Sequence, residues 1–364
     1  MTQSSDTLLC LLRYALGNEK ESDNNIHGMN DAGWEEVMHI ASRHGVAALA
    51  FDGIEKIYGG KPDGMAPELW TRWIANTLMM EQRHEKYRKV IEELSNLLRE
   101  HGLTAMLLKG YGLSLNYPKP NHRPSGDIDI YSLGRHGEID LIAERELNAS
   151  ICRDNPHHSI FTYHGFMIEN HATILNVETK KANRKCEKLL CQIAEDCRNG
   201  KKGIVMPSAK FNSVHILRHM AGDFASAGTS LRHLTDWATF VNKNKENIDW
   251  EFVQTVAKAN RMERFLDALN AICTEYLGFC STDFPVYKQD DKLRDRVLSD
   301  ILYPKFDDDV SSKDNIIRFG WVRTRRIWIN RWKHNMVFDE PILRTYIRQS
   351  VSWVVRHYLK KTTH

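Results

Sequence analysis

The sequence predicts an α+β fold, in which a short mixed β-sheet with packed helices is flanked by helical regions at both ends of the chain. Two observations predict this fold class. Before residue 103 and after residue 178, apolar residues recur every three or four positions, as they do on amphipathic helices. Between these limits, short apolar or alternating runs are bounded by glycine and proline, which is typical of strands. We therefore divide the chain into an N-terminal helical region (1–102), an α/β core (103–178) and a C-terminal helical region (179–364).

The composition is that of an ordinary globular protein. Of 364 residues, 42% are hydrophobic and 27% are charged, and the net charge of +3 is too small to demand a nucleic-acid or membrane partner. No apolar run approaches the roughly 20 residues of a membrane span. The seven cysteines form no C-x-x-C pair, which favours free thiols. We therefore expect a cytoplasmic protein without a membrane partner.

The N-terminal region contains four predicted helices. Residues 8–12 form an apolar run with no basic segment before it, which indicates a helix rather than a signal peptide. Residues 34–40 and 47–57 predict the next two helices. Residues 67–100 give the clearest pattern, because their apolar residues lie on one helical face. Gly102 marks the end of this helix, since glycine readily adopts positive φ.

The remaining elements are predicted in order along the chain. The core is expected to contain a buried strand at 104–108, a brief helix ending at 116, a proline-rich loop at 117–124, a strand at 127–131, a helix at 136–147 and a hairpin of strands 159–163 and 166–174. Helical spacing then returns at 214–220, 231–241, 250–277 and 316–332.

Two aspartates in the alternating strand are the centre of the predicted site. Side chains alternate across a strand, so Asp127 and Asp129 project to one face, and Ile128 and Ile130 point into the core. Two like charges this close need a counter-charge, and hard oxygen ligands favour Mg²⁺, with Mn²⁺ as a substitute. A D-x-D pattern also arises by chance. Residues 307–309 contain one without apolar alternation, which we interpret as a solvated loop.

Three neighbouring features favour a catalytic site over a strand-end cap. Lys109 and Gly110 lead from a strand into a short helix, where backbone amides can hold phosphate. Arg123 could contact a triphosphate tail or a leaving pyrophosphate. Glu169 lies on the hairpin, whose strand can bring a third carboxylate beside the aspartates, as a two-metal site requires. Two alternatives stay open: Glu169 could face solvent, and Lys109 and Arg123 could instead form salt bridges with the carboxylates.

These residues resemble a known family. The stretches at 107–110, 117–118 and 123–129 (LLKG, YP and RPSGDID) resemble the uncharacterised bacterial nucleotidyltransferase family, which belongs to the DNA polymerase beta-like superfamily. Further parts of the chain are similar to this family: Trp34, 44–46 (HGV), 168–171 (IENH, where the usual form is Glu-Leu-His) and 231–237 (LRHLTDW). The resemblance extends to about residue 245.

The resemblance implies the minimal nucleotidyltransferase fold and a set of functional residues. It implies that the metal-binding and catalytic carboxylates are Asp127, Asp129 and Glu169. The nucleotide-binding residues that it implies are Lys109, Gly110, Tyr111, Arg123, Ser125 and Gly126. At 109–111, Lys-Gly-Tyr stands where the superfamily has Gly-Ser or Gly-Gly.

The resemblance also implies a reaction. A nucleoside monophosphate would be transferred from a nucleoside triphosphate such as ATP to a hydroxyl acceptor by a two-metal mechanism. The acceptor could be a small molecule, a protein side chain or an RNA end. A second function class is a catalytically silent protein of the same fold that binds nucleotide or nucleic acid in a regulatory role. The intact carboxylates favour the enzyme, since a binding module has no need of three converging acids.

Two helical segments carry further polar patterns. His215, His219 and Asp223 are spaced four apart, which can bind zinc, although core or capping histidines are the favoured interpretation. Arg232 and Asp236 are also four apart, which predicts an ion pair within one helix. The next interpretation for Asp236 is that it holds the C-terminal helices to the core.

The segment 318–333 is both basic and aromatic. One interpretation is a polynucleotide surface, where rings stack on bases and arginines hold phosphates. The favoured interpretation is an amphipathic helix with Trp321, Trp328 and Trp332 in the core, because these residues step by seven and four. A peripheral membrane helix is the least favoured, since nothing else in the sequence points to lipid.

Overall fold

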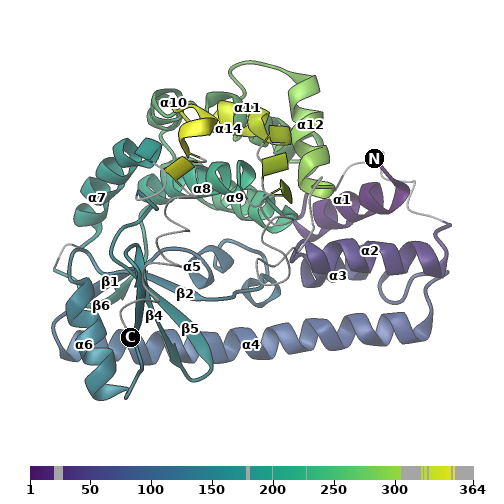
Figure 1. Ribbon diagram of the computed structural model, residues 1–364. Coiled ribbons are helices and arrows are strands. Elements are labelled where there is room, and N and C mark those ends of the chain that lie inside the picture. The colour runs from purple at the N-terminus through teal and green to yellow at the C-terminus, as the bar shows by residue number, and fades with distance from the viewer. Residues whose placement is uncertain are drawn as a thin grey trace.

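The computed structural model describes residues 1–19, 28–177, 181–198, 200–226 and 228–304, and 321–348 with gaps at 323, 326, 327 and 346. Figure 1 shows the sheet lying between the long helix α4 below it and helices α7, α8 and α9 above it. Helices α1 to α3 pack beside the sheet, against the far half of α4. None of the helices in the described ranges is both long and apolar enough to cross a membrane.

The four predicted N-terminal helices are confirmed. They are α1 (Gln3–Ala15), α2 (Asp31–Arg43), α3 (Ala47–Tyr58) and α4 (Pro67–Glu100). Gly102 follows α4 with φ of 65°, as predicted for the residue that ends this helix. The first half of α4 packs Leu69 and Trp73 against α1 to α3, and its second half packs Val90 and Leu94 under the sheet. One helix thus joins the N-terminal region to the sheet.

The sheet is mixed, as the predicted fold class requires. Its strands are β1 (Thr104–Leu107), β2 (Ile128–Tyr131), β3 (Cys152–Asn155), β4 (His158–Tyr163), β5 (Phe166–His171) and β6 (Gly203–Val205), in the order β3-β4-β5-β2-β1-β6. β2 pairs antiparallel with β1 and parallel with β5, and β4 and β5 form the predicted hairpin. β2 therefore occupies a central position, with β5 directly beside it.

Two strands differ from the sequence prediction. β3 is a polar edge strand with exposed residues, so it lacks the apolar alternation by which strands are recognised. β6 has only three residues and pairs parallel with β1, although it lies beyond residue 178 in the sequence. The sheet thus recruits its sixth strand from the C-terminal part of the chain.

Each face of the sheet is covered by different helices. Ile128 and Ile130 point toward α4 and α6 (His136–Glu146), as the alternation predicts. The opposite face packs against α7 (Arg184–Arg198) and α8 (Ala209–Phe224). The short helix α5 (Tyr111–Ser114) and the 3-10 turn η2 (Pro120–His122) lie in the connection from β1 to β2.

Further helices complete the C-terminal part. They are α9 (Leu231–Asn244), α10 (Trp250–Ala259), α11 (Glu263–Glu275), α12 (Asp291–Leu302) and α14 (Arg331–Val337), with short 3-10 turns η3 (Lys181–Asn183) and η4 (Lys245–Asn247). The segment predicted as one helix over 250–277 is two, because Arg261 adopts a φ of 57° between them. α8, α9, α11 and α12 share one hydrophobic core with α1 to α3.

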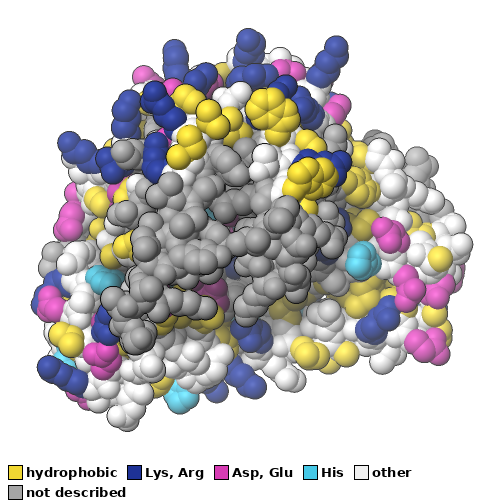
Figure 2. Space-filling model, in the orientation of Figure 1, with side chains coloured by type: hydrophobic (Ala, Val, Ile, Leu, Met, Phe, Trp, Pro, Cys, Tyr) yellow, Lys and Arg dark blue, Asp and Glu magenta, His cyan; other side chains and the backbone are white. Residues whose placement is uncertain are grey.

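The predicted core position of two tryptophans is wrong. Trp321 and Trp328 are 62% and 65% exposed, and only Trp332 is partly buried, edge-on to Phe224. Spacing shows that residues share a helical face but not which face meets the core, and α14 buries Met336 and Val337 instead. Figure 2 shows hydrophobic side chains exposed among lysines and arginines on the face where α14 lies. Residues 307–309, predicted as a loop, lie outside the described residues.

Candidate functional site

A cavity of about 170 Å³ lies between the β1–β2 connection and helices α8 and α9. Its lining is rich in polar and ionisable groups. The lining residues are Lys109, Gly110, Leu113, Arg123, Gly126, Asp127, Asp129, His215, Ile216, His219, Met220, Arg232, His233 and Asp236. Six of these are predicted site residues, so the sheet and the C-terminal helices together enclose most of the predicted site.

Three carboxylates converge at the sheet side of the cavity. Asp127 and Asp129 both line it, and Asp129 is paired in register with Glu169 of the parallel strand β5. Burial raises the pKa of Asp127, and the negative charges of Glu169 and Asp129 raise it further. The three carboxylates therefore repel one another, and a bound cation would relieve this repulsion.

Two cationic groups partly neutralise these acids. Lys109 Nζ lies 3.1 Å from Asp129 Oδ1, and His171 Nε2 lies 3.0 Å from the same oxygen and 3.3 Å from Glu169 Oε2. Burial would raise the pKa of Asp129, but Lys109 and His171 outweigh it and hold this pKa well below its usual range. Burial would also lower the pKa of His171, but its hydrogen bonds to Asp129 and Glu169 raise it. Asp129 is therefore an anion at neutral pH.

Gly110 and Tyr87 fix the position of Asp127. Tyr87, from α4, donates a hydrogen bond of 2.5 Å to the backbone oxygen of Asp127. Gly110 has φ of 56°, and a Cβ at this position would lie 2.8 Å from the Tyr87 hydroxyl. Glycine is thus required here both for its backbone conformation and for the close approach of Tyr87. The turn after β1 and the start of β2 are joined through this tyrosine.

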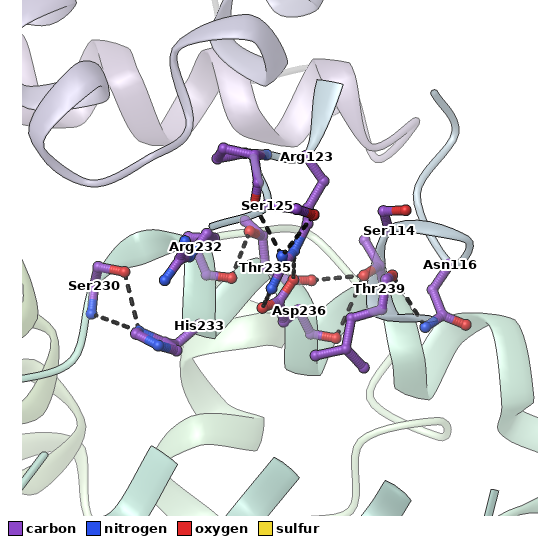
Figure 3. A network of polar contacts seen from close by, with 12 residues as sticks. Ser114, Asn116, Arg123, Ser125, Ser230, Arg232, His233, Thr235, Asp236 and Thr239 are labelled. Carbon is purple, nitrogen blue, oxygen red and sulfur yellow. Dashed lines mark hydrogen bonds and ion pairs between the residues drawn. The ribbon is translucent and has the colours of Figure 1, made fainter. Parts of the chain in front are cut away.

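Arg123 and Asp236 form the buried ion pair that joins the proline-rich loop to α9 (Figure 3). Arg123 donates from Nε to Asp236 Oδ1 at 3.0 Å and from Nη2 to Oδ2 at 2.7 Å. Tyr117 donates a third hydrogen bond, of 2.7 Å, to Asp236 Oδ1. Breaking such a buried pair costs about 3–5 kcal/mol, since it leaves one charge buried and unpaired. Asp236 thus holds the C-terminal helices to the core, and the predicted Arg232–Asp236 pair is wrong because Arg123 takes this carboxylate.

Arg232 lines the cavity and makes no ion pair with any carboxylate in the described part of the chain. Its backbone N–H donates to His44 O at 3.2 Å, which places it in the first turn of α9 beside the end of α2. In Figure 3, where both arginines are drawn, contacts are marked from the guanidinium of Arg123 and not from that of Arg232. Its buried Nε has no hydrogen-bond partner among the described residues.

Three histidines, His215, His219 and His233, also line the cavity. Burial lowers the pKa of His215 to about 3 and that of His233 to about 4, and it holds the pKa of His219 well below its usual value. These rings are therefore neutral at pH 7. His219 faces the cavity, but His215 is a core residue that lies against Phe211, as the favoured interpretation of this helix predicts.

Among the described residues, two acid–histidine groups and one group of histidines could hold a metal ion. The first is Asp129, Glu169 and His171, whose ligand atoms lie within 4.8 Å of one another. The second group, at the cavity rim, is His219, Asp223 and His233, and the third is His157, His158 and His171. In the rim group, the backbone N–H of Ser230 donates to His233 Nδ1 at 3.2 Å, so the neutral ring carries its proton on Nε2, toward Asp223. His233 Nε2 lies 3.8 Å from Asp223 Oδ2, which is beyond hydrogen-bond distance, but this nitrogen carries the proton that a metal here would have to displace.

A family model described as an uncharacterised nucleotidyltransferase matches residues 30–278, which is more than half of the chain. The chain belongs to this family. No curated protein and no solved structure matches the sequence. Membership supports nucleotidyl transfer as the type of reaction, with a nucleotide as substrate. The matched residues begin in front of α2 and end after α11, so they include the whole cavity of this nucleotidyltransferase.

The structure brings together most of the predicted site residues of this nucleotidyltransferase. Glu169 lies beside Asp129 but does not line the cavity. Tyr111 packs under the sheet with its ring tilted against that of His84, at 5.2 Å between centroids, and Ser125 lines a neighbouring groove along α4. The sequence reasoning missed His171, Arg232 and His233 as residues of the site. The family-like segments at 168–171 and 231–237 contain all three, and this was the signal that could have found them.

Proposed function

We propose that this nucleotidyltransferase transfers a nucleoside monophosphate from a nucleoside triphosphate to a hydroxyl acceptor, using divalent metal held by Asp127, Asp129 and Glu169. The observation that carries this proposal is that Asp127 and Asp129 line a cavity that also contains Lys109 and Arg232, with Glu169 beside Asp129 on the neighbouring strand. The carboxylates suit a metal, and the two cationic side chains suit phosphates. The DNA polymerase beta-like superfamily, which the sequence resembles, supports the same reaction.

The donor set fits a hard divalent cation. Asp129 and Glu169 offer oxygens beside His171, and the raised pKa of Asp127 reflects burial and the repulsion that a cation would relieve. Oxygen ligands favour Mg²⁺, and Mn²⁺ accepts both oxygen and imidazole ligands. When bound, the metal would stabilise the charge of the triphosphate and lower the pKa of the acceptor hydroxyl.

We assign the following roles to the residues around the cavity. Asp127 and Asp129 would hold the metal, and Glu169 would accept the proton of the acceptor hydroxyl. Lys109, Gly110 and Gly126, which line the cavity, would contact the nucleotide. Arg123 also lines it, but its guanidinium is bound to Asp236, so we propose that it positions the loop that carries the aspartates. Tyr111 and Ser125 lie outside this cavity, and we propose no nucleotide contact for them.

A thermal-shift experiment tests this proposal. We expect magnesium together with a nucleoside triphosphate to raise the melting temperature of the native protein, because a ligand that binds only the folded state stabilises it. Replacing Asp127→Asn and Asp129→Asn together should abolish the rise. A double variant that responds as the native protein does would show that the metal site is elsewhere or absent. Incubation with each labelled triphosphate and cell extract would then identify the acceptor.

A further inference from the structure

The cavity contains three strong cations, and two of them are already paired. Lys109 lies 3.1 Å from Asp129, and Arg123 makes a two-pronged ion pair with Asp236. Arg232 differs, because no carboxylate of the described chain lies within ion-pair distance of its guanidinium, and its buried Nε has no hydrogen-bond partner. Arg232 is therefore the cavity cation that remains available to an incoming anion.

This unpaired arginine sits in an unfavourable environment. Burial lowers the pKa of Arg232, and the positive charge of Arg123 lowers it further. The carboxylates of Asp236 and Asp223 offset this only in part, and His219 and His233 are neutral at pH 7, so they add no charge. A half-buried cation without an ion-pair partner costs free energy that an anionic ligand would recover on binding.

The surroundings of Arg232 hold its side chain in place without neutralising it. A Cβ added at Gly45 would lie 3.4 Å from Arg232 Cδ and 3.5 Å from Pro124 Cγ, so the aliphatic stem of Arg232 and this proline both border Gly45. His44 accepts two hydrogen bonds from the first turn of α9. The backbone N–H of Arg232 donates to its backbone oxygen, and the backbone N–H of Leu231 donates to its Nδ1. His44 Nε2 then donates to Leu302 O at 3.2 Å. Arg232 is thus positioned by three separate parts of the chain before any ligand binds.

We propose that Arg232 is the anion-binding side chain of this cavity, and that it binds the two phosphates of the triphosphate that leave as pyrophosphate. This inference rests on the proposed function. A guanidinium offers several N–H donors in a planar fork, which matches two phosphate oxygens at once. Asp127 and Asp129 repel phosphate, whereas the carboxylate of Asp236, which lies near Arg232, is already bound to Arg123. The ligand's distal phosphates are therefore best accommodated beside Arg232.

In the reaction, the acceptor oxygen forms a bond to the α-phosphorus while the bond from that phosphorus to its bridging oxygen breaks. The electron pair of the broken bond goes to pyrophosphate, and the proton of the acceptor hydroxyl goes to Glu169. Arg232 would neutralise the charge that develops on the pyrophosphate. Its contribution would therefore be larger in the transition state than in the bound substrate.

Titration calorimetry with inorganic pyrophosphate, with and without magnesium, tests the assignment. We expect Arg232→Gln to weaken pyrophosphate binding by about tenfold or more, because a charge-assisted, two-pronged contact is lost. Arg232→Lys should give an intermediate loss, since it keeps the charge but not the fork. The matched control is Arg83→Gln, which removes the same charge near Asp127 but outside the cavity, and it should change the affinity by less than about threefold.

Thermal denaturation of the ligand-free variants separates ligand binding from a structural role. Removing a half-buried cation without an ion-pair partner should leave Arg232→Gln at least as stable as the native protein, whereas loss of a structural contact would lower its melting temperature. Equal pyrophosphate affinity of Arg232→Gln and the native protein, or no binding by the native protein under either condition, would overturn the inference.

The two proposals can fail separately. If the native protein forms a labelled nucleotidyl product and Arg232→Gln keeps full pyrophosphate affinity, the proposed function stands and the role of Arg232 is wrong. If pyrophosphate binding depends on Arg232 but the response to magnesium and triphosphate does not depend on Asp127 and Asp129, the cavity is an anion site and the proposed catalysis is wrong.

Discussion

At the scale of single residues, the protonation of His122 links the stability of the fold to pH. It is 3% exposed and lies between Asp52 of α3, at 2.7 Å, and Glu81 of α4, at 2.8 Å, while Lys119 also contacts Asp52. Burial would lower the pKa of His122, but the two carboxylates outweigh it and raise this pKa above its usual value. The ion pairs therefore stabilise the fold while His122 is protonated.

The sign of the resulting pH dependence follows directly. A histidine whose folded pKa exceeds the unfolded value of about 6.5 stabilises fully below that pH, and its contribution is lost as the pH rises through the folded pKa. We expect the free energy of unfolding of the native protein to exceed that of His122→Gln most at pH 5.5, with the difference shrinking toward pH 8.5. Urea denaturation measures it. His39→Gln, which removes an exposed histidine of α2, is the control, and a difference independent of pH would contradict the prediction.

The sequence predicted those features of the site that depend on residues close together in the chain. The alternation predicted that Asp127 and Asp129 share one face, and both line the cavity, although β2 begins at Ile128 and Asp127 lies one residue before it. The partner of Asp236 could not be predicted in this way. A spacing of four suggested Arg232, whereas Arg123, which is 113 positions away in the sequence, reaches the carboxylate through the tertiary fold.

At the scale of secondary structure, the crossing of α1 and α3 depends on a glycine. A Cβ at Gly53 of α3 would overlap the backbone oxygen of Leu11 in α1, so the two helices pack backbone to backbone there. We expect Gly53→Ala to lower the free energy of unfolding by about 2 kcal/mol or more, because the helices must separate. Gly137→Ala in α6 is the matched control, since its Cβ would meet open space. It should instead stabilise by up to about 1 kcal/mol. Equal effects of the two substitutions in urea denaturation would contradict this account.

Elements were predictable where their own residues carry the signal. The bounds of α4 were predicted from apolar periodicity and its flanking proline and glycine. β6 could not be found, because three residues are too few to show a period and its pairing with β1 spans about 100 positions of sequence. The break between α10 and α11 was missed because Arg261, which adopts positive φ there, is not a residue type that marks turns.

At the scale of the whole molecule, the two terminal helical regions form one structural unit. Residues of α1 to α3, such as Leu11 and Trp34, belong to the same hydrophobic core as Phe265 and Leu302 from the C-terminal part. The cavity is built in the same way, with carboxylates from the sheet and Arg232 from α9. Removing either helical region would therefore expose the shared core and dismantle one wall of the site.

This arrangement predicts how the molecule unfolds. Large chains often unfold in several steps, domain by domain, but here the shared core couples α1 to α3 with α8 to α12. We expect calorimetry to show one cooperative transition in which the helices of both regions unfold together. Its calorimetric enthalpy should equal its van't Hoff enthalpy. Amide hydrogen exchange should show α1 and α11 opening with the same free energy, because neither can lose its packing without the other. Two resolved transitions, or a fragment of residues 1–102 that folds by itself, would show that the N-terminal helices form an independent domain.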